Sequence, residues 1–485
     1  MKLSKLTEKL NILSANADFD AEITSVCYDS RKAEKGCLFV AIKGTASDGH
    51  KYIPAVAEAG CTAVICEDIP ETNVAYIQVE DSRRALALIS CAYYDYPAEK
   101  MKIIGVTGTS GKTTTTNLIK HILEKTLGCK TGLIGTNGNM IGDVSVHTEF
   151  TTPESLELQK LFAQMVEAGC EYCIMEVSSH ALYMNRVAGI TFSTAAFTNL
   201  SQDHLDLHNT MQEYAAAKRL IFSVCEKACI NLDDEFAPFM LEKIEVPVIT
   251  TSAMQEDAGL IAKDIRLSAS GVRFVAVNGE NSGIVRLAIP GLFSVYNALT
   301  ALSVCLSEGI SLEEGALALA DAEGVKGRLE TVPTDGDYSI IIDYSHKPDA
   351  LEKVLQTLRK VTRGRLICLF GCGGDRDRAK RPLMGEIAAD NADYVIVTSD
   401  NPRTEDPLAI IEEIVPGVKG RKTPYDVVPD RIDAIHRAID IAQTGDVILL
   451  AGKGHEDYQI IGHVKHHMDE REIVSEYLKE RVYVH

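Results

Sequence analysis

A short apolar strand at residues 102–106 leads into a loop of glycine, threonine and serine, and then into a lysine. Backbone N–H groups in such a loop can converge on one anion, and the helix that follows adds its positive end. The lysine would neutralise phosphate charge, and the next threonine hydroxyl would bind magnesium. The pattern predicts a nucleoside triphosphate site formed by Gly108, Thr109, Ser110, Gly111, Lys112, Thr113 and Thr114.

The spacing departs from the usual phosphate-loop pattern G-x-x-x-x-G-K-[ST]. The position of the first glycine is Val106, which Gly105 and Gly108 flank. A glycine-rich turn without a ligand is the alternative. A strand before the loop favours phosphate binding, as does the helical apolar spacing after it, which ends at Gly128.

Three more polar residues follow this loop along the chain. Glu176 stands near the end of the apolar run 173–177, where a carboxylate can hold a metal ion that bridges phosphates. A capping or salt-bridged glutamate is the alternative. His204 follows the run 194–197, which would direct it to the same sheet edge. Lys218, taken alone, is a solvated helix charge.

The C-terminal third repeats one theme. The apolar runs 365–370, 394–399 and 446–450 each end in a glycine-rich or charged loop. Open α/β sheets bind ligands at the carboxyl ends of their strands. These loops therefore predict a second binding site, distinct from the phosphate loop.

Composition limits the classes of function. The chain has 485 residues and a net charge of −20, which argues against nucleic acid as a partner. No apolar run approaches the ~18 residues of a membrane span, and the N-terminus lacks a signal core. Thirteen cysteines without a framework are typical of reduced thiols. We expect a cytoplasmic protein.

The fold class expected is α/β in three domains. Strands alternate with helices after residue 101, which indicates a mainly parallel sheet with flanking helices. We predict a smaller N-terminal α/β substrate domain at 1–97, a central phosphate-loop domain at 98–326 and a C-terminal Rossmann-like α/β domain at 327–485.

Six motifs in order resemble those of the Mur ligases, the ATP-dependent amide-forming enzymes of bacterial cell-wall precursor synthesis. They are the phosphate loop, Glu176-Val-Ser-Ser-His, Asn199-Leu-Ser-Gln-Asp-His, Tyr296-Asn-Ala, Gly327-Arg-Leu-Glu and Asp343-Tyr-Ser-His-Lys-Pro-Asp. The resemblance covers almost the whole chain.

The resemblance implies roles for residues that give no functional signal when each is considered alone. Lys112 would neutralise the ATP phosphates, which Asn297 and Arg328 would also contact. Two magnesium ions are implied, one held by Thr113 and Glu176, the other by His204 and a carbamylated Lys218. The implied contacts to the nucleotide–peptide substrate are Ser30, Thr151, Thr152, Ser178 and Arg186, although Met184 replaces an expected glutamine.

Substrate choice within the family depends on the stretch Asp400-Asn401-Pro402-Arg403, which in the family recognises meso-diaminopimelate. An arginine fork can bind the second carboxylate of that amino acid, which lysine lacks. Arg376, Gly452 and Glu456 match the family's other contacts to the amino acid.

The implied reaction adds meso-2,6-diaminopimelate to UDP-N-acetylmuramoyl-L-alanyl-D-glutamate through an acyl phosphate, in cytoplasmic peptidoglycan precursor synthesis. Small-molecule substrates alone are expected as partners, and the protein is expected to be a monomer. The alternatives are a lysine-adding ligase of the same family, a folylpolyglutamate synthase, and a switch protein that uses ATP only to change shape.

Overall fold

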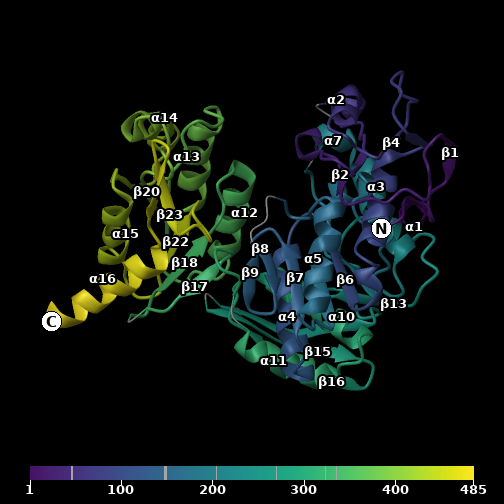
Figure 1. The fold of residues 1–485 in the computed structure, drawn as a ribbon. Coiled ribbons are helices and arrows are strands. Elements are labelled where there is room, and N and C mark those ends of the chain that lie inside the picture. Colours follow the sequence, from purple (N-terminus) through teal and green to yellow (C-terminus); the bar gives the residue numbers. More distant parts are fainter. Residues whose placement is uncertain are drawn as a thin grey trace. The chain divides into compact units, whose positions relative to one another are not determined.

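The computed structural model describes residues 1–44, 47–146, 150–203, 205–268, 270–322, 324–334 and 336–484. The chain divides into two compact units, Met1–Leu260 with Thr300–Ser311 and Ile261–Leu299 with Leu312–His485. Each unit is a mixed α/β structure, which confirms the predicted fold class (Figure 1). The division does not coincide with the three ranges expected from sequence, and those boundaries stay a prediction.

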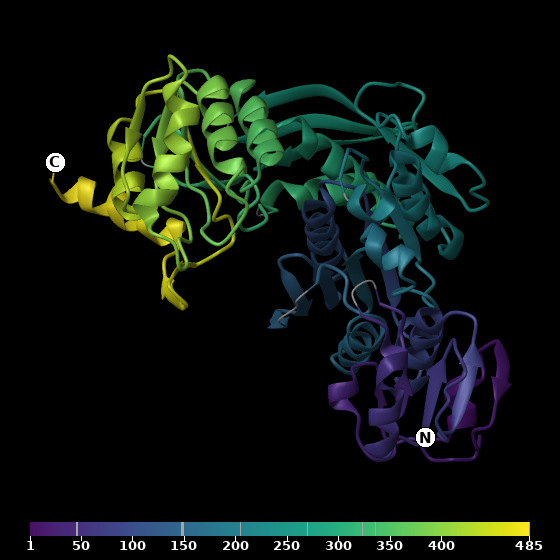
Figure 2. The same ribbon diagram turned by 90° about the horizontal axis from the view of Figure 1, so that it is seen from above.

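The first unit begins with a sheet in the order β1-β5-β4-β3-β2. Its strands β2 to β5 run parallel and β1 is antiparallel. Helices lie beside this sheet (purple, Figure 2), and buried apolar side chains fill both of its faces. The elements are α1 (Leu3–Thr7), β1 (Ile12–Ala15), β2 (Val26–Cys27), η1 (Ser30–Lys32), β3 (Leu38–Val40), η2 (Gly49–Tyr52), α2 (Ile53–Glu58), β4 (Ala63–Cys66), β5 (Tyr76–Val79), α3 (Ser82–Tyr93) and η3 (Pro97–Glu99).

A second sheet in this unit has the order β13-β12-β11-β6-β10-β7-β8-β9. The strands from β13 to β7 are parallel, and β8 and β9 add antiparallel hairpins. The elements are β6 (Lys102–Thr107), α4 (Lys112–Leu127), β7 (Thr131–Gly135), β8 (Gly138–Ile141), β9 (Val144–Val146), α5 (Ser155–Glu167), β10 (Tyr172–Glu176), α6 (Ser179–Tyr183), β11 (Thr194–Phe197), α7 (Leu205–His208), α8 (Met211–Arg219), η4 (Leu220–Val224), β12 (Ala228–Asn231), α9 (Ala237–Leu241) and β13 (Val248–Ser252).

Strand β6 lies between β10 and β11, so both of its edges are paired. Ile103, Ile104 and Val106 are at most 1% exposed, as expected of an apolar run in a parallel sheet. Its loop leads directly into α4, which ends at Gly128 in the left-handed region, with φ +64°. The strand, loop and helix predicted from sequence are therefore confirmed.

The second unit opens with an antiparallel meander that the sequence analysis did not predict. Its strands β15 and β16 alternate between more and less buried positions, so one face is solvated, unlike the continuous buried runs of β6 or β10. The elements are β14 (Leu260–Ser268), β15 (Gly271–Asn278), β16 (Asn281–Leu287), α10 (Leu292–Ser307), α11 (Leu312–Ala318) and η5 (Leu319–Asp321). The part of α10 from Thr300 onward belongs to the first unit.

The C-terminal sheet has the order β17-β18-β22-β19-β20-β21 and is parallel apart from β17. Helices α12 to α14 pack on one face, and α15 and α16 on the other (Figure 1). The elements are β17 (Glu330–Val332), β18 (Ser339–Asp343), α12 (Pro348–Arg359), β19 (Leu366–Phe370), α13 (Lys380–Asn391), β20 (Tyr394–Val397), α14 (Pro407–Lys419), β21 (Tyr425–Val427), α15 (Arg431–Asp440), β22 (Val447–Ala451), β23 (Tyr458–Ile461), β24 (Val464–His467) and α16 (Glu470–Val484).

Candidate functional site

The phosphate loop is held by the loop that follows β11. Thr109 N–H donates to the Asn199 carbonyl at 2.8 Å, and Ser110 N–H donates to the Asn199 side-chain oxygen at 3.0 Å. The Thr198 hydroxyl donates to the Ser110 carbonyl at 2.7 Å. A Cβ on Gly108, where φ is +147°, would lie 1.9 Å from the Thr198 hydroxyl oxygen. Only glycine fits there, because the Thr198 side chain packs directly against the backbone of the phosphate loop.

Lys112 is the cation of the phosphate loop, and it contacts carbonyls of the same loop. Lys112 Nζ donates to the carbonyls of Gly108 and Thr109, both at 2.9 Å. Gly111 precedes α4 with φ +83°, so the chain turns sharply into the helix. The first N–H groups of α4 have no partner within the helix and carry its positive dipole end. The loop thus combines a cation with a helix N-terminus, as an anion site requires.

The Glu176 carboxylate accepts three hydrogen bonds at the end of β10. Its oxygens accept from the Thr113 hydroxyl at 2.8 Å, from Thr136 N–H at 2.9 Å and from the Thr136 hydroxyl at 3.1 Å. The residue is 1% exposed. Register explains the placement, because Glu176 pairs with Val106 on β6, just before the loop. Two predicted ligands, Thr113 and Glu176, are therefore in direct contact.

Lys218 is buried in α8 and is 1% exposed. Its Nζ donates to the Gly108 carbonyl at 2.8 Å and lies 4.6 Å from the centre of the Tyr214 ring. Burial is the main cause that lowers the pKa of this amine well below 10.5, and the nearby Lys112 charge lowers the pKa further. Asp203 offsets this only in part. The expectation of a solvated helix charge for this residue alone is wrong.

His204, the remaining predicted metal ligand, lies outside the described residues. Within the ranges that the structure covers, no group of three His, Cys, Asp or Glu side chains is arranged to hold a metal. The Thr113 hydroxyl and the Glu176 carboxylate are nevertheless hard oxygen donors in contact. That donor set suits Mg²⁺ rather than a soft metal.

Three of the residues predicted to bind the nucleotide–peptide substrate form a second cluster beside β10. The Thr152 hydroxyl donates to the Glu176 carbonyl at 2.8 Å and lies 3.4 Å from the Ser178 hydroxyl. Arg186 donates to the Thr152 carbonyl at 2.9 Å and pairs with Glu154 at 2.7 Å. The Met184 sulfur lies 3.9 Å from the same guanidinium. Because sulfur is only a weak acceptor, it replaces the expected amide poorly.

Thr151 lies near this cluster, whereas Ser30 lies near a cavity of the same unit. The Thr151 hydroxyl is 3.0 Å from that of Thr136. Ser30 begins η1, next to Asp29 and Arg31, which line a cavity of about 680 Å³. The cavity lies between the N-terminal sheet and α5, and its lining also includes Tyr28, Lys32, Asn139, Phe150, Glu154 and Glu157.

In the second unit, residues 400–403 form a loop after β20. Arg403 has φ +51°, and its guanidinium donates to the Gly374 carbonyl at 2.9 Å. A Cβ on Gly374 would lie 1.9 Å from the Pro402 carbonyl oxygen, and one on Gly373 would lie 2.9 Å from Arg403 Nη1. The glycines after β19 therefore leave space for the arginine.

The other predicted amino-acid contacts surround this loop unevenly. The Asn401 amide donates to the Glu456 carboxylate at 2.9 Å. Gly452 has φ +113°, and a Cβ there would lie 2.8 Å from the Asp400 carboxylate. Arg376 is exposed, and its guanidinium donates to the Asp375 carbonyl at 3.1 Å. The structure thus joins Asp400, Asn401, Gly452 and Glu456, while Arg376 stands at the rim.

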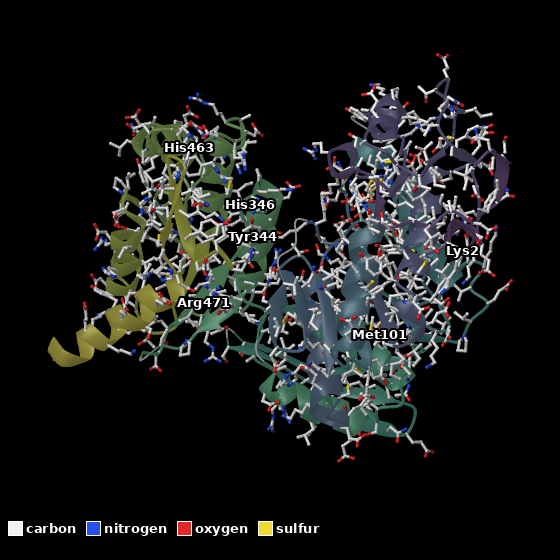
Figure 3. All side chains as sticks on the ribbon, viewed as in Figure 1. Lys2, Met101, Tyr344, His346, His463 and Arg471 are labelled. Atoms are coloured by element: carbon white, nitrogen blue, oxygen red, sulfur yellow. The ribbon has the colours of Figure 1, made fainter. Side chains whose placement is uncertain are left out.

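Arg328 belongs to an aromatic cluster at the end of β18. Its guanidinium lies 5.3 Å from the centre of the Tyr344 ring, which contacts the rings of His346 and His455 at 4.7 and 4.8 Å. Figure 3 shows Tyr344 and His346 beside each other in this unit. Burial lowers the pKa of both histidines. Asn297 is 4% exposed on α10. The neutral histidines leave Arg328 as the cation of this cluster.

Comparison with known proteins gives matches along nearly the whole chain. Three family models match in order: the Mur ligase family catalytic domain at residues 22–94, the Mur ligase middle domain at 106–305 and the Mur ligase glutamate ligase domain at 327–454. A Clostridium acetobutylicum protein named UDP-N-acetylmuramoyl-L-alanyl-D-glutamate–2,6-diaminopimelate ligase 1 is 45% identical over 99% of this chain and 100% of its own length. The chain belongs to the Mur ligase family.

Two further comparisons agree with that assignment. A Caldanaerobacter subterraneus ligase with the same substrates in its name is 48% identical over 95% of this chain and 96% of its own. A solved structure of a UDP-N-acetylmuramoyl-L-alanyl-D-glutamate–2,6-diaminopimelate ligase matches with a TM-score of 0.77 and 32% identity, over 99% of both chains. This Mur ligase is accordingly an enzyme that joins two substrates, which confirms the predicted class. In the parts of the chain that the structure describes, no helix is long and apolar enough to cross a membrane.

Sequence analysis missed one buried cation of this Mur ligase. Lys453 is 0% exposed, and its Nζ donates to the Asn401 side-chain oxygen at 2.6 Å and to the Tyr458 carbonyl at 2.7 Å. The carboxylates of Asp400 and Glu456 are each 3.5 Å away. Burial lowers the pKa of this amine, and Asp400 raises it in part. The only sequence signal was its place in a glycine-rich loop after β22.

Two buried arginines also support the site and were missed. Arg381 is 0% exposed and binds the Glu405 carboxylate with two nitrogens, at 2.8 and 2.9 Å, just after the loop that carries Arg403. Arg431 donates to the carbonyls of Ser399, two residues after β20, and Ala451, the last residue of β22, at 3.3 and 2.9 Å. Strands β20 and β22 lie on either side of β19. Neither contact could be derived from spacing, because each joins residues at least twenty positions apart.

Proposed function

We propose that this Mur ligase uses ATP to join meso-2,6-diaminopimelate to UDP-N-acetylmuramoyl-L-alanyl-D-glutamate. The single observation that carries the proposal is the loop of residues 400–403, in which an arginine fork is presented beside a buried amide and carboxylate. Relatives of 45 and 48% identity that carry these substrates in their names support it.

The first step would take place at the phosphate loop. The side-chain carboxylate of D-glutamate attacks the γ-phosphate of ATP, giving an acyl phosphate and ADP. Two anions must approach each other, so positive charge has to be concentrated there. Lys112 and the N-terminus of α4 would supply that charge. Arg328 and Asn297 would add further contacts to ATP.

Magnesium would be held by the Thr113 hydroxyl and the Glu176 carboxylate, and a second ion by His204 and Lys218. When bound, these ions neutralise phosphate charge and hold the phosphates in line for transfer. Thr136 would keep the Glu176 carboxylate oriented through its two hydrogen bonds. Loss of that orientation would weaken metal binding, as is usual for groups that hold a ligand in place.

Lys218 has the chemistry needed for carbamylation. An amine reacts with carbon dioxide only in its neutral form, and burial favours that form here. The reaction forms an N–C bond and releases one proton, which turns the neutral amine into a negatively charged carbamate. The Gly108 carbonyl, 2.8 Å from Nζ, would then accept the carbamate N–H.

In the second step, the amine of diaminopimelate attacks the acyl carbon and phosphate leaves. Arg403 would bind the distal carboxylate of the amino acid in a bidentate manner, and Glu456 its distal amine. Lys453 would act as a positioning residue, since it holds the side chain of Asn401 and faces Asp400 and Glu456. Arg376 and Gly452 would complete the site.

The cavity beside Tyr28 and Asp29 would hold the nucleotide end of the second substrate, with Ser30 at its rim. Thr151, Thr152, Ser178 and Arg186 would contact the peptide. We further propose a cytoplasmic monomer with domains at 1–97, 98–326 and 327–485.

The experiment that tests this function measures phosphate release with UDP-N-acetylmuramoyl-L-alanyl-D-glutamate, ATP and magnesium, with either meso-diaminopimelate or L-lysine. We expect phosphate and tripeptide product in equal amounts with diaminopimelate, and roughly 10³-fold lower kcat/KM with lysine, because lysine leaves Arg403 without its carboxylate. Equal use of both amino acids would contradict the recognition role. Phosphate release without product would favour a switch protein.

A further inference from the structure

Three cysteines of the N-terminal sheet converge, although 10 and 24 residues separate them along the chain. Cys27 ends β2, Cys37 precedes β3, and Cys61 precedes β4. The Cys37 and Cys61 sulfurs are 2.7 Å apart, and the Cys27 S–H donates to Cys37 Sγ at 3.7 Å. None of the three lines the cavity described above.

We propose that Cys37 and Cys61 form a reversible intramolecular disulfide when the protein meets hydrogen peroxide. The 2.7 Å between the sulfurs compares with about 2.05 Å in a disulfide bond, so closure needs only a small movement. Two backbone hydrogen bonds fix the pair: Gly36 N–H donates to the Gly60 carbonyl at 3.0 Å, and Thr62 N–H to the Cys37 carbonyl at 2.8 Å.

Access and ionisation divide the roles between the two sulfurs. Cys61 is partly exposed, whereas Cys37 is 0% exposed. Hydrogen bonding from Cys27 is the main cause that lowers the pKa of Cys37 to about 6, and Cys61 acts in the same direction. Burial raises the pKa of Cys61 to about 12. Cys37 therefore holds the thiolate and Cys61 the proton. Transfer of that proton across the 2.7 Å between the sulfurs places the thiolate on the partly exposed Cys61.

The reaction balances with peroxide as the oxidant. The Cys61 thiolate attacks one peroxide oxygen, the O–O bond breaks, and the hydroxide that leaves takes a proton to become water. Cys37 then attacks the Cys61 sulfur; the S–S bond forms, the S–O bond breaks, and the second oxygen leaves as water. Two thiols and one peroxide give one disulfide and two waters.

The contrast with other thiols supports the assignment. Cys66 is 0% exposed on β4, and Cys129 is 8% exposed after α4. Burial raises the pKa of both. Buried thiols of that kind are poor nucleophiles.

The test treats the whole protein with hydrogen peroxide, alkylates the remaining thiols under denaturing conditions and maps tryptic peptides by mass spectrometry without reduction. Trypsin separates the three sulfurs, because Cys27, Cys37 and Cys61 fall in peptides 10–31, 36–43 and 52–83. We expect peptides 36–43 and 52–83 to be joined, to separate on reduction, and to form at least roughly ten-fold faster than Cys129 is oxidised.

Two variants decide which sulfur is bonded, since peptide 52–83 also holds Cys66. Cys66→Ser should keep the cross-link, and Cys61→Ser should abolish it. A cross-link that survives Cys61→Ser would overturn the proposal. So would free thiols at Cys37 and Cys61 after Cys129 has been oxidised, a result that needs only the unaltered protein and so does not depend on the folding of either variant.

Discussion

Each of the two compact units contains a lysine that is at most 1% exposed, and the surroundings of these two lysines differ. Lys218 in the first unit is 1% exposed, and its Nζ contacts a backbone carbonyl and an aromatic ring. Lys453 in the second unit is 0% exposed, with two carboxylates at 3.5 Å and a side-chain amide oxygen at 2.6 Å. No carboxylate in the described parts of the chain forms an ion pair with Lys218.

The difference teaches that burial alone does not define the role of a lysine. Desolvation lowers the pKa of both amines, but at Lys453 two carboxylates raise it again, whereas at Lys218 the Lys112 charge lowers it further. We infer that Lys218 is kept neutral and therefore reactive, while Lys453 stays a cation that organises the loops around it. The comparison leads to four predictions.

The largest loss of activity is expected from Lys218→Ala. Without the amine no carbamate can form, so kcat should fall by roughly 10³-fold, the scale seen when a group that stabilises developing charge is removed. Short carboxylic acids such as acetate should restore part of the activity by entering the space left by the side chain. Phosphate release with and without the acid measures this.

A matched control is Lys120→Ala on α4, a buried lysine whose Nζ lies 2.6 Å from the Glu124 carboxylate. Acids should not raise its activity. Ample activity of Lys218→Ala without added acid would break the proposed contrast between the two lysines.

Arg403→Ala should have the next largest effect. Loss of a bidentate, charge-assisted contact should lower kcat/KM for diaminopimelate roughly 100-fold, because one partner of a buried charge pair is removed. ATP binding should change little, because the loop belongs to the amino-acid half of the reaction. Arg421→Ala, which removes an exposed arginine that pairs with Asp390, is the control. A comparable loss in ATP affinity would contradict the assignment.

Sequence could predict the parts of the site that lie in one stretch of chain. Each of these parts lies at the end of an apolar run: the phosphate loop, Glu176 and the 400–403 loop. Within each sheet, parallel strands bring their carboxyl ends to the same edge. Their placement therefore follows from pattern alone.

Contacts between distant stretches could not be predicted in this way. Lys453 meets Asn401 across 52 positions, and the cysteine pair depends on the register of β3 with β4. The meander β14–β16 was missed because an overall alternation of strands and helices was extended across it. His204 stays a prediction, since it lies outside the described residues.

Lys453→Met tests the contrast between the two lysines by its effect on the free energy of unfolding. The substitution leaves the buried Asp400 carboxylate and the partly buried Glu456 carboxylate without their shared cation, which should lower the free energy of unfolding by about 3 kcal/mol. The KM for diaminopimelate should rise roughly ten-fold, because Asn401 loses its partner, while the KM for ATP should not change. Calorimetry and initial rates measure these effects. Unchanged stability would mean that Lys453 is neutral in the folded protein and does not act as a cation.

Lys218→Met should change stability in the opposite direction and by less. Because the folded pKa of Lys218 is lowered, the unfolded chain holds a proton that the folded chain lacks, and the free energy of unfolding falls as pH drops from 10.5 towards the folded pKa. Methionine has no such proton, so the variant should melt a few degrees higher at neutral pH, and the gain should vanish near pH 10.5. Melting curves in buffers free of carbon dioxide, which keep the amine unmodified, measure this. A variant that melts lower at neutral pH would mean that Lys218, like Lys453, stabilises the fold as a cation.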